Sequence, residues 1–269
     1  MNPHLEVTRP SVCLLTVFGM VVGLLILDLS YGLWLLPLIS TLLICAAGNV
    51  INDYFDAEID KVNRPKRPIP SGRLSRKAAF RMYALLNAAG LLAALLVSLP
   101  FFALAAVNSI VLYVYSARLK KTILGNLADT YLAVSVFIAP VLIKGGFLDI
   151  LSSSLLILAL IPFFANYGRE ILKDVEDAKG DKKSGARTLP IVFGKSRAMR
   201  LARAMILVAA AALFAPYFKA IFPANYLIFA ALGAIGCVYI ASLKNATKMQ
   251  KCLKALMFYV LAVFLAFSI

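Results

Sequence analysis

Four oxygen-bearing side chains stand in register at the end of a long apolar segment: Asn49, Asp53, Asp56 and Asp60. Their spacing of i, i+4, i+7 and i+11 keeps them within about 60° of one face of a helix. Carboxylates stacked this closely repel one another, and a cation among them would relieve the repulsion. The row therefore predicts a binding site for a divalent metal ion.

A second row repeats this spacing further along the chain, with Glu170, Asp174, Asp177 and Asp181. Its three aspartates follow those of the first row at a constant offset of 121 residues, and Arg-Pro-Ile-Pro at 67–70 is echoed by Arg-Thr-Leu-Pro at 187–190. The intervening segments show no convincing identity, so we interpret the pattern as a weak internal repeat. We expect one domain over residues 1–269 with two related halves, whose acidic motifs cover 49–60 and 170–181.

The donor atoms of both rows are carboxylate and amide oxygens, with no histidine or cysteine among them. Such a set suits Mg²⁺, which keeps several waters and takes one or two carboxylates together with phosphate oxygens. For a single aspartate at a helix end, a role as an ordinary solvated residue is about as frequent as a functional role. Two rows, each followed by a basic loop, favour the functional interpretation, and the expected ligand is a diphosphate held through magnesium.

Basic side chains near the two rows could neutralise a departing diphosphate. The candidates are Arg64, Lys66 and Arg67 after the first row, Lys120 and Lys121 between the rows, and Arg169 and Lys173 within the second. Pro65 prevents the helix from continuing, so the loop is expected to fold Arg64 and Arg67 back over the row. For each of these residues alone, a role in membrane topology is an equally good explanation.

Aromatic side chains near the same ends of their apolar segments could face a carbocation with their rings. The candidates are Tyr115, Phe163, Phe164 and Tyr167. Packing in the core or at the membrane interface is the more frequent role of such residues.

The composition indicates which kind of structural element carries these side chains. The 269 residues are 62% hydrophobic and 15% charged, with a mean hydropathy of +0.87, values typical of a polytopic membrane protein and not of a soluble domain. Apolar runs of spanning length predict an all-α bundle of about nine transmembrane helices, with Pro100 breaking a hairpin between the third and the fourth. Their expected ranges are 11–29, 33–57, 78–98, 100–117, 126–143, 150–173, 199–217, 224–243 and 253–269.

The net charge of +15 could suggest nucleic acid, but its placement indicates otherwise. In the nine-helix arrangement every one of the 28 lysines and arginines except Lys144 and Lys219 falls on one side. Because basic loops stay in the cytoplasm, this predicts a multi-pass protein of the cell membrane with a cytoplasmic N-terminus and active site, and no nucleic-acid partner. The four cysteines form neither a disulfide framework nor a zinc pattern.

Three segments carry a family resemblance: NVINDYFDAEIDKVNRPKRPIPSG, YSARLKK and YGREILKDVEDAKGDKKSGARTLP. Over essentially its whole length the chain resembles the UbiA-type intramembrane prenyltransferases. The resemblance implies a helical bundle around a central cavity, with the two Asp-rich motifs facing each other under a cytoplasmic cap of loops. It also implies two Mg²⁺ ions that bridge the diphosphate of an isoprenyl substrate.

The family pattern also implies roles for particular residues. NxxxD and DxxxD map onto Asn49, Asp53, Asp177 and Asp181 as metal ligands. Asp56, Asp60 and Asp174 match further carboxylates of the motifs. We take these three residues, together with the basic Lys120, as catalytic candidates. Glu170 extends the second row but is not part of the family pattern.

Three functions compete. The first, which the resemblance favours, transfers a geranylgeranyl group from geranylgeranyl diphosphate to the free hydroxyl of geranylgeranylglyceryl phosphate, a step of archaeal ether lipid synthesis. The second has the same chemistry with an aromatic acceptor, as in quinone biosynthesis. The third is a cation transporter, which is disfavoured because the carboxylates lie at helix ends beside basic loops and not at mid-span.

Overall fold

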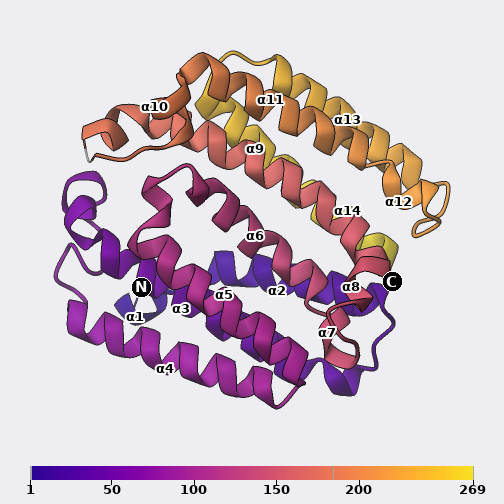
Figure 1. Ribbon diagram of the computed structural model, residues 1–269, viewed down its shortest axis with the longest axis horizontal. Helices are drawn as coiled ribbons and strands as arrows, with labels where there is room; N and C mark the ends of the chain where they lie inside the picture. The colour runs from indigo at the N-terminus through magenta and orange to yellow at the C-terminus, as the bar shows by residue number, and fades with distance from the viewer. Residues whose placement is uncertain (1, 184, 269) are drawn as a thin grey trace. The chain divides into compact units, whose positions relative to one another are not determined.

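The computed structural model describes residues 2–183 and 185–268; Ser184, within the third segment quoted above, lies outside them. In these ranges the chain is helical apart from its loops and one isolated bridge between Thr122 and Arg187 (Figure 1). Six of the described helices are long and apolar enough to cross a membrane, and three shorter ones are also apolar. The predictions of an all-α fold and of a multi-pass membrane protein are confirmed.

Within residues 2–183 and 185–268 the nine longer helices are α2 (Pro10–Ile26), α3 (Leu35–Asn63), α4 (Arg76–Leu95), α5 (Leu99–Ala117), α6 (Leu124–Ile138), α9 (Ser154–Lys183), α11 (Lys195–Ala212), α13 (Tyr226–Ser242) and α14 (Ala246–Ser268). Shorter elements connect them: α1 (Pro3–Val7), η1 (Tyr31–Leu33), η2 (Leu119–Lys121), α7 (Val141–Lys144), α8 (Asp149–Ser152), α10 (Leu189–Phe193) and α12 (Ala215–Phe218).

Some helix boundaries differ from the sequence prediction. Both acidic rows are helical to their ends, because α3 continues to Asn63 and α9 to Lys183. The range expected at 126–143 is divided, with α6 ending at Ile138 and the short α7 following Pro140. Pro100 lies in the first turn of α5 and is not the residue that ends the preceding helix, since α4 has already ended at Leu95. Ser98 caps α5 by accepting from Phe101 N at 3.2 Å.

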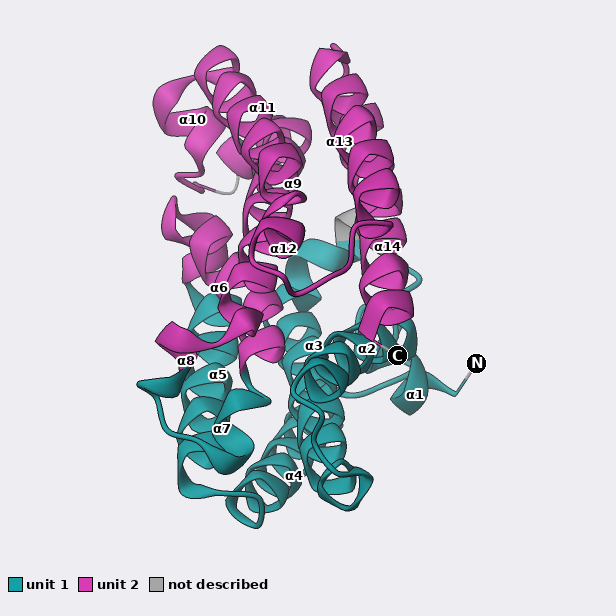
Figure 2. Cartoon of the chain, turned by 90° about the vertical axis from the view of Figure 1, so that its right-hand side faces the viewer, with its two compact units in different colours: residues 1–118, 139–149 teal, residues 119–138, 150–269 magenta. Residues whose placement is uncertain are grey.

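The chain divides into two compact units, residues 1–118 with 139–149 and residues 119–138 with 150–269 (Figure 2). In the first unit α3 packs against α2, α4 and α5. A buried cluster of Val7, Val50, Ala57, Ile69, Leu74 and Ala79 joins α1 and α3 to the loop before α4. This cluster fixes the basic loop that follows the first acidic row.

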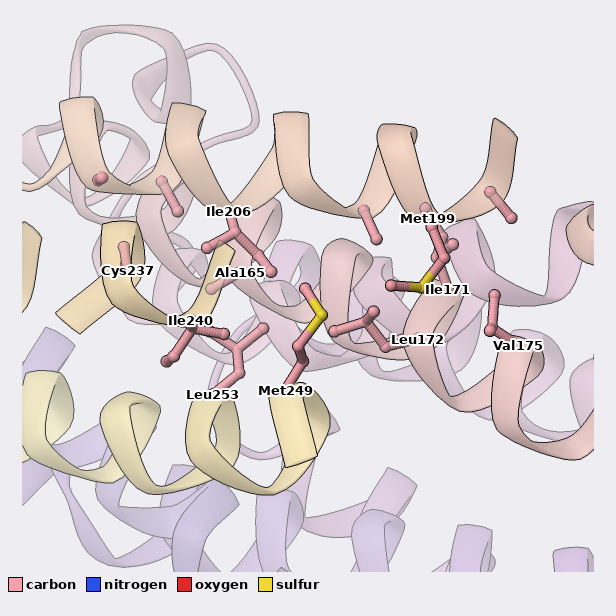
Figure 3. Close-up of a cluster of buried hydrophobic side chains, with 14 of the residues drawn as sticks. Ala165, Ile171, Leu172, Val175, Met199, Ile206, Cys237, Ile240, Met249 and Leu253 are labelled. Atoms are coloured by element: carbon pink, nitrogen blue, oxygen red, sulfur yellow. The ribbon is translucent and has the colours of Figure 1, made fainter. Parts of the chain in front are cut away.

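In the second unit α9 packs against α6, α11 and α14. Ile171, Leu172 and Val175 of α9 meet Met199 and Ile206 of α11, and Met249 and Leu253 of α14 close the cluster (Figure 3). Gly168 allows the close approach of α11, because a Cβ there would lie 3.1 Å from the carbonyl oxygen of Ala202. The second acidic row therefore begins on the most firmly packed helix of its unit. The prediction of a single domain over residues 1–269 stays a prediction.

Candidate active site

The first acidic row lies on the last turns of α3. Asp53 and Asp60 are buried, with 3% and 5% of their surface exposed, whereas Asn49 and Asp56 are half-buried. The helix stops at Asn63 because the following Arg64 precedes Pro65 and takes a non-helical conformation, with φ −145° and ψ 60°. The chain then turns back toward α3.

Arg67 connects two carboxylates of this row. Its Nη1 donates to Asp53 Oδ1 at 3.1 Å and to Asp60 Oδ2 at 2.5 Å. Its side chain is 18% exposed, against 4% for Asp53 and 7% for Asp60. Ile69 and Leu74 anchor the loop in the core of the unit, so that Arg67 holds the two carboxylates as a shared counter-ion.

The N-terminal segment also reaches the row, which the sequence did not indicate. Arg9 Nη2 donates to Asp53 Oδ1, and the carbonyl oxygen of Thr8 accepts from Asn49 Nδ2 at 2.9 Å. A basic residue before the first apolar run is explained by topology alone, so no signal in the sequence distinguished Arg9. Asp53 consequently lies between two arginines.

An open pocket of about 380 Å³ lies beside Arg67 in the same unit. Arg64, Lys66, Arg67, Pro65 and Glu6 line it. Glu6 accepts from Arg73 at 2.7 and 3.1 Å, and this hydrogen bonding holds the pKa of Glu6 below its usual value. The loop and the N-terminal segment together thus form a basic recess at the end of α3.

The second acidic row lies on α9 in the other unit. Asp174 and Asp181 are half-buried and Asp177 is exposed. Asn126 of α6 donates to Asp174 Oδ2 at 2.8 Å. This amide fixes one carboxylate of the second row.

At the first position of the row, α9 carries a compact ionic cluster around Glu170. Glu170, which is 3% exposed, accepts from Arg169 at 2.5 Å and from Lys173 at 3.0 Å. Asn166 accepts from Arg169 at 3.2 Å and donates to Asp129 of α6 at 3.1 Å. Arg169 and Lys173, predicted as phosphate ligands, therefore both pair with Glu170.

Asn126 and Asp129 were missed by the sequence analysis, although a signal existed for Asp129. Asp129 lies inside the apolar run predicted at 126–143, and an ionisable side chain within a span marks a functional position by default. Asn126 is the first residue of that run and carries no such signal. Neither shares the spacing of the two rows. Their partners on α9 become visible only once the helices are packed.

The predicted residues Lys120 and Lys121 form the end of η2, immediately before α6. Gly125 allows this tight junction, because a Cβ there would lie 2.7 Å from Leu119 O and 2.9 Å from Lys120 Cα. The carbonyl oxygen of Lys121 accepts from Arg187 N at 2.7 Å, and Asp181 O accepts from Ala186 N at 3.0 Å. The backbone of Lys121 is thus tied to the segment that follows the second row.

The predicted aromatic residues are divided between the units. Tyr115 is half-buried on α5, and the other three lie on α9. Phe163 stacks on Tyr167 with ring centroids 6.3 Å apart and contacts Phe164 edge-on at 5.3 Å. Phe164 and Tyr167 also pack against the buried cluster of the second unit, so these two have a structural role.

The residues of the first row suit a divalent cation. Nη1 of Arg67 lies within hydrogen-bonding distance of Asp53 and Asp60 at once, so one cationic group can be shared by both carboxylates. The donors are all oxygens, which is the set that Mg²⁺ prefers. Among the described residues, no three His, Cys, Asp or Glu side chains already form a metal-binding group.

The fold and these motifs define a class. The model of the UbiA prenyltransferase family matches residues 12–262, and the chain belongs to this family. It is an intramembrane prenyltransferase.

Individual relatives indicate a more specific activity than the family does. The chain is 41% identical over 276 residues to the digeranylgeranylglyceryl phosphate synthase of Methanopyrus kandleri, covering 99% of each protein. It is similar to a solved structure of a digeranylgeranylglyceryl phosphate synthase, with a TM-score of 0.82, 34% identity and coverage of 99% and 97%. A solved UbiA homolog from Archaeoglobus fulgidus bound to DMAPP and Mg²⁺ shares the fold, with a TM-score of 0.72, 21% identity and coverage of 97% and 98%.

Proposed function

We propose that this protein transfers a geranylgeranyl group from geranylgeranyl diphosphate to the free hydroxyl of geranylgeranylglyceryl phosphate, forming digeranylgeranylglyceryl phosphate. The observation that carries the proposal is the full-length similarity to the Methanopyrus kandleri synthase of that product, in a chain that retains both acidic rows. The same residues would serve an aromatic acceptor equally well, so the acceptor rests on the similarity and not on the site.

We propose Asn49, Asp53, Asp177 and Asp181 as ligands of two Mg²⁺ ions, with Asp56, Asp60 and Asp174 supporting them. When bound, the metal would supply Lewis-acid neutralisation of the diphosphate leaving group. Asp53 and Asp60 would exchange their contacts with Arg67 for this cation. The sharing of one guanidinium nitrogen by both carboxylates supports this exchange.

The basic residues would bind the phosphate groups of the two substrates. These are Arg64, Lys66 and Arg67 in the first unit and Lys120, Lys121, Arg169 and Lys173 in the second. Arg67, once released from Asp53 and Asp60, would donate to phosphate oxygens as the negative charge grows in the transition state.

The reaction breaks the bond between C1 of the prenyl group and the diphosphate oxygen, and the electron pair leaves with the diphosphate. A lone pair of the acceptor hydroxyl forms the new bond to C1, and the hydroxyl proton is lost late to a weak base such as a carboxylate or the released diphosphate. Tyr115, Phe163, Phe164 and Tyr167 would exclude water from the cationic carbon and face it with their rings.

We further propose that the two acidic rows face each other across a central cavity beneath a cytoplasmic cap, and that the N-terminus is cytoplasmic. The distribution of basic residues supports this orientation, because only Lys144 and Lys219 fall in the opposite loops. The polyprenyl tails would then extend into the apolar part of the bundle.

The test is the identity of the product. Purified protein in detergent receives geranylgeranyl diphosphate, Mg²⁺ and geranylgeranylglyceryl phosphate, and mass spectrometry follows the lipid. We expect an ether-linked product one geranylgeranyl group heavier than the acceptor, formed with release of diphosphate. Hydrolysis of the donor to its alcohol, without a new ether, would contradict the proposal.

A further inference from the structure

The pocket at the end of α3 contains two cationic side chains that take part in none of the ion pairs between described residues. Among the ion pairs of the described residues, Arg67 is bound to Asp53 and Asp60, and Glu6 is bound to Arg73. Arg64 and Lys66 line the same pocket, are exposed, and form no ion pair with another described residue. The pocket therefore offers about two positive charges that Glu6, the acid in its lining, does not neutralise.

We infer that this pocket binds the phosphate monoester of the prenyl acceptor, with Arg64 and Lys66 as its ligands. The inference rests on the proposed function. It assigns a binding site to the second anionic group of that reaction, the phosphate of the acceptor. A phosphate monoester carries close to two negative charges at neutral pH. Arg64 can bind two of its oxygens through the guanidinium fork, and Lys66 adds a point charge.

The arrangement of charges separates the two phosphate sites. Asp53 and Asp60 are buried, Arg67 beside them is partly exposed, and Arg64 and Lys66 lie outermost. A diphosphate held by a metal must reach the buried carboxylates, on the inner side of Arg67. The outer pocket is then left for an anion that needs no metal, and Arg67 stands between the two.

The pocket also has the size and the shape that a headgroup requires. Its volume of about 380 Å³ is at the small end of ligand sites and is large enough for a glycerol phosphate. It is held in place on both sides, since Ile69 and Leu74 anchor the loop and Arg73 fastens the N-terminal segment through Glu6. Arg73 Nη2 also donates to the carbonyl oxygen of Lys66 at 2.5 Å, which fixes the backbone at that ligand.

The experiment compares two acceptors that differ only in the phosphate, geranylgeranylglyceryl phosphate and geranylgeranylglycerol. In the wild-type protein we expect removal of the phosphate to raise the acceptor KM by at least about tenfold, since a charged ligand interaction is lost. In Arg64→Gln and Lys66→Gln the KM for the phosphorylated acceptor should rise by a similar factor, while the KM for geranylgeranylglycerol and for the diphosphate donor stays within about twofold.

Lys77→Gln is the matched control, because Lys77 is an exposed basic residue of α4 outside the pocket. It should change none of these constants. A rise in the donor KM in Arg64→Gln or Lys66→Gln, or an equal rise for both acceptors, would overturn the assignment.

A binding measurement separates this inference from the proposed function. Glycerol 1-phosphate added to detergent-purified protein, followed by ³¹P NMR, should bind the wild type and Lys77→Gln but not the Arg64→Gln, Lys66→Gln double variant. Product formation from geranylgeranylglyceryl phosphate without such binding would refute the phosphate site and leave the function standing. Binding without product formation would retain the site and refute the function.

Discussion

Asn126 of α6 donates its side-chain amide to Oδ2 of Asp174 on α9 across 2.8 Å, although the two residues are 48 positions apart. The hydrogen bond crosses the packed contact between these helices and sets the rotamer of one carboxylate in the second acidic row. If Asp174 has the role proposed above, Asn126 is a positioning residue that acts through it.

Asn126→Ala should lower kcat by about tenfold, equivalent to about 1.4 kcal/mol, because Asp174 would lose the donor that orients it. Steady-state kinetics at saturating Mg²⁺ measures the loss, and Asn126→Asp should not restore it because an acceptor cannot replace the amide donor. Thr130→Val is the control on the same helix, since its buried hydroxyl has no hydrogen-bond partner in the described part of the chain. If Asn126→Ala keeps wild-type turnover, Asp174 does not depend on this bond.

Activity should disappear with a chelator and return with Mg²⁺, because both acidic rows present only oxygen donors. Asp53→Asn and Asp177→Asn should each lower turnover by at least about 100-fold, or roughly 2.7 kcal/mol. Glu58→Gln and Glu176→Gln remove exposed acids from the same two helices and should have little effect. Full activity of either aspartate variant in a correctly folded protein would disprove that ligand assignment.

Arg67→Gln should destabilise the metal-free protein by about 2 kcal/mol, because Asp53 and Asp60 would remain buried without their shared cation. Mg²⁺ should reduce the difference, since a bound metal takes over the neutralisation and stabilises the folded state. Thermal unfolding in detergent, with chelator and with Mg²⁺, measures both effects. Arg64→Gln, an exposed neighbour in the same loop, should shift Tm little, and an equal loss in both buffers would argue against exchange between arginine and metal.

Single cysteines in a cysteine-free protein test the orientation. Ser75 and Ser196 are exposed beside basic segments, and Leu148, which is 81% exposed, lies near Lys144. An impermeant thiol reagent should label Ser75→Cys and Ser196→Cys only after the membrane is opened, and Leu148→Cys in intact cells. The opposite pattern would invert the orientation and place the acidic rows outside.

The helices and the two acidic rows were predictable from the sequence because both depend on local pattern. Hydropathy over about twenty residues marks the spans, and the helical period places Asp53 and Asp60 on one face. The return of the chain after α3 followed from Pro65, which bars continuation of the helix at Arg64.

The partners of the rows were not predictable, because they come from segments that meet only in the packed unit. Arg9 and Asp53 are 44 residues apart, and nothing near Arg9 marks it as a ligand. Asp129 gave a signal, an acid inside an apolar span, but its partner Asn166 depends on the packing of α6 against α9. How the two rows lie with respect to each other stays a prediction.

Acceptor competition tests the central claim most directly. Purified protein with labelled geranylgeranyl diphosphate and Mg²⁺ receives geranylgeranylglyceryl phosphate, 4-hydroxybenzoate and dihydroxynaphthoate at equal concentration in one detergent. Chromatography of the labelled products should give digeranylgeranylglyceryl phosphate as the dominant product, with little prenylated aromatic acid. Preferential prenylation of either aromatic acid would contradict the assigned acceptor and leave only the chemistry at the diphosphate intact.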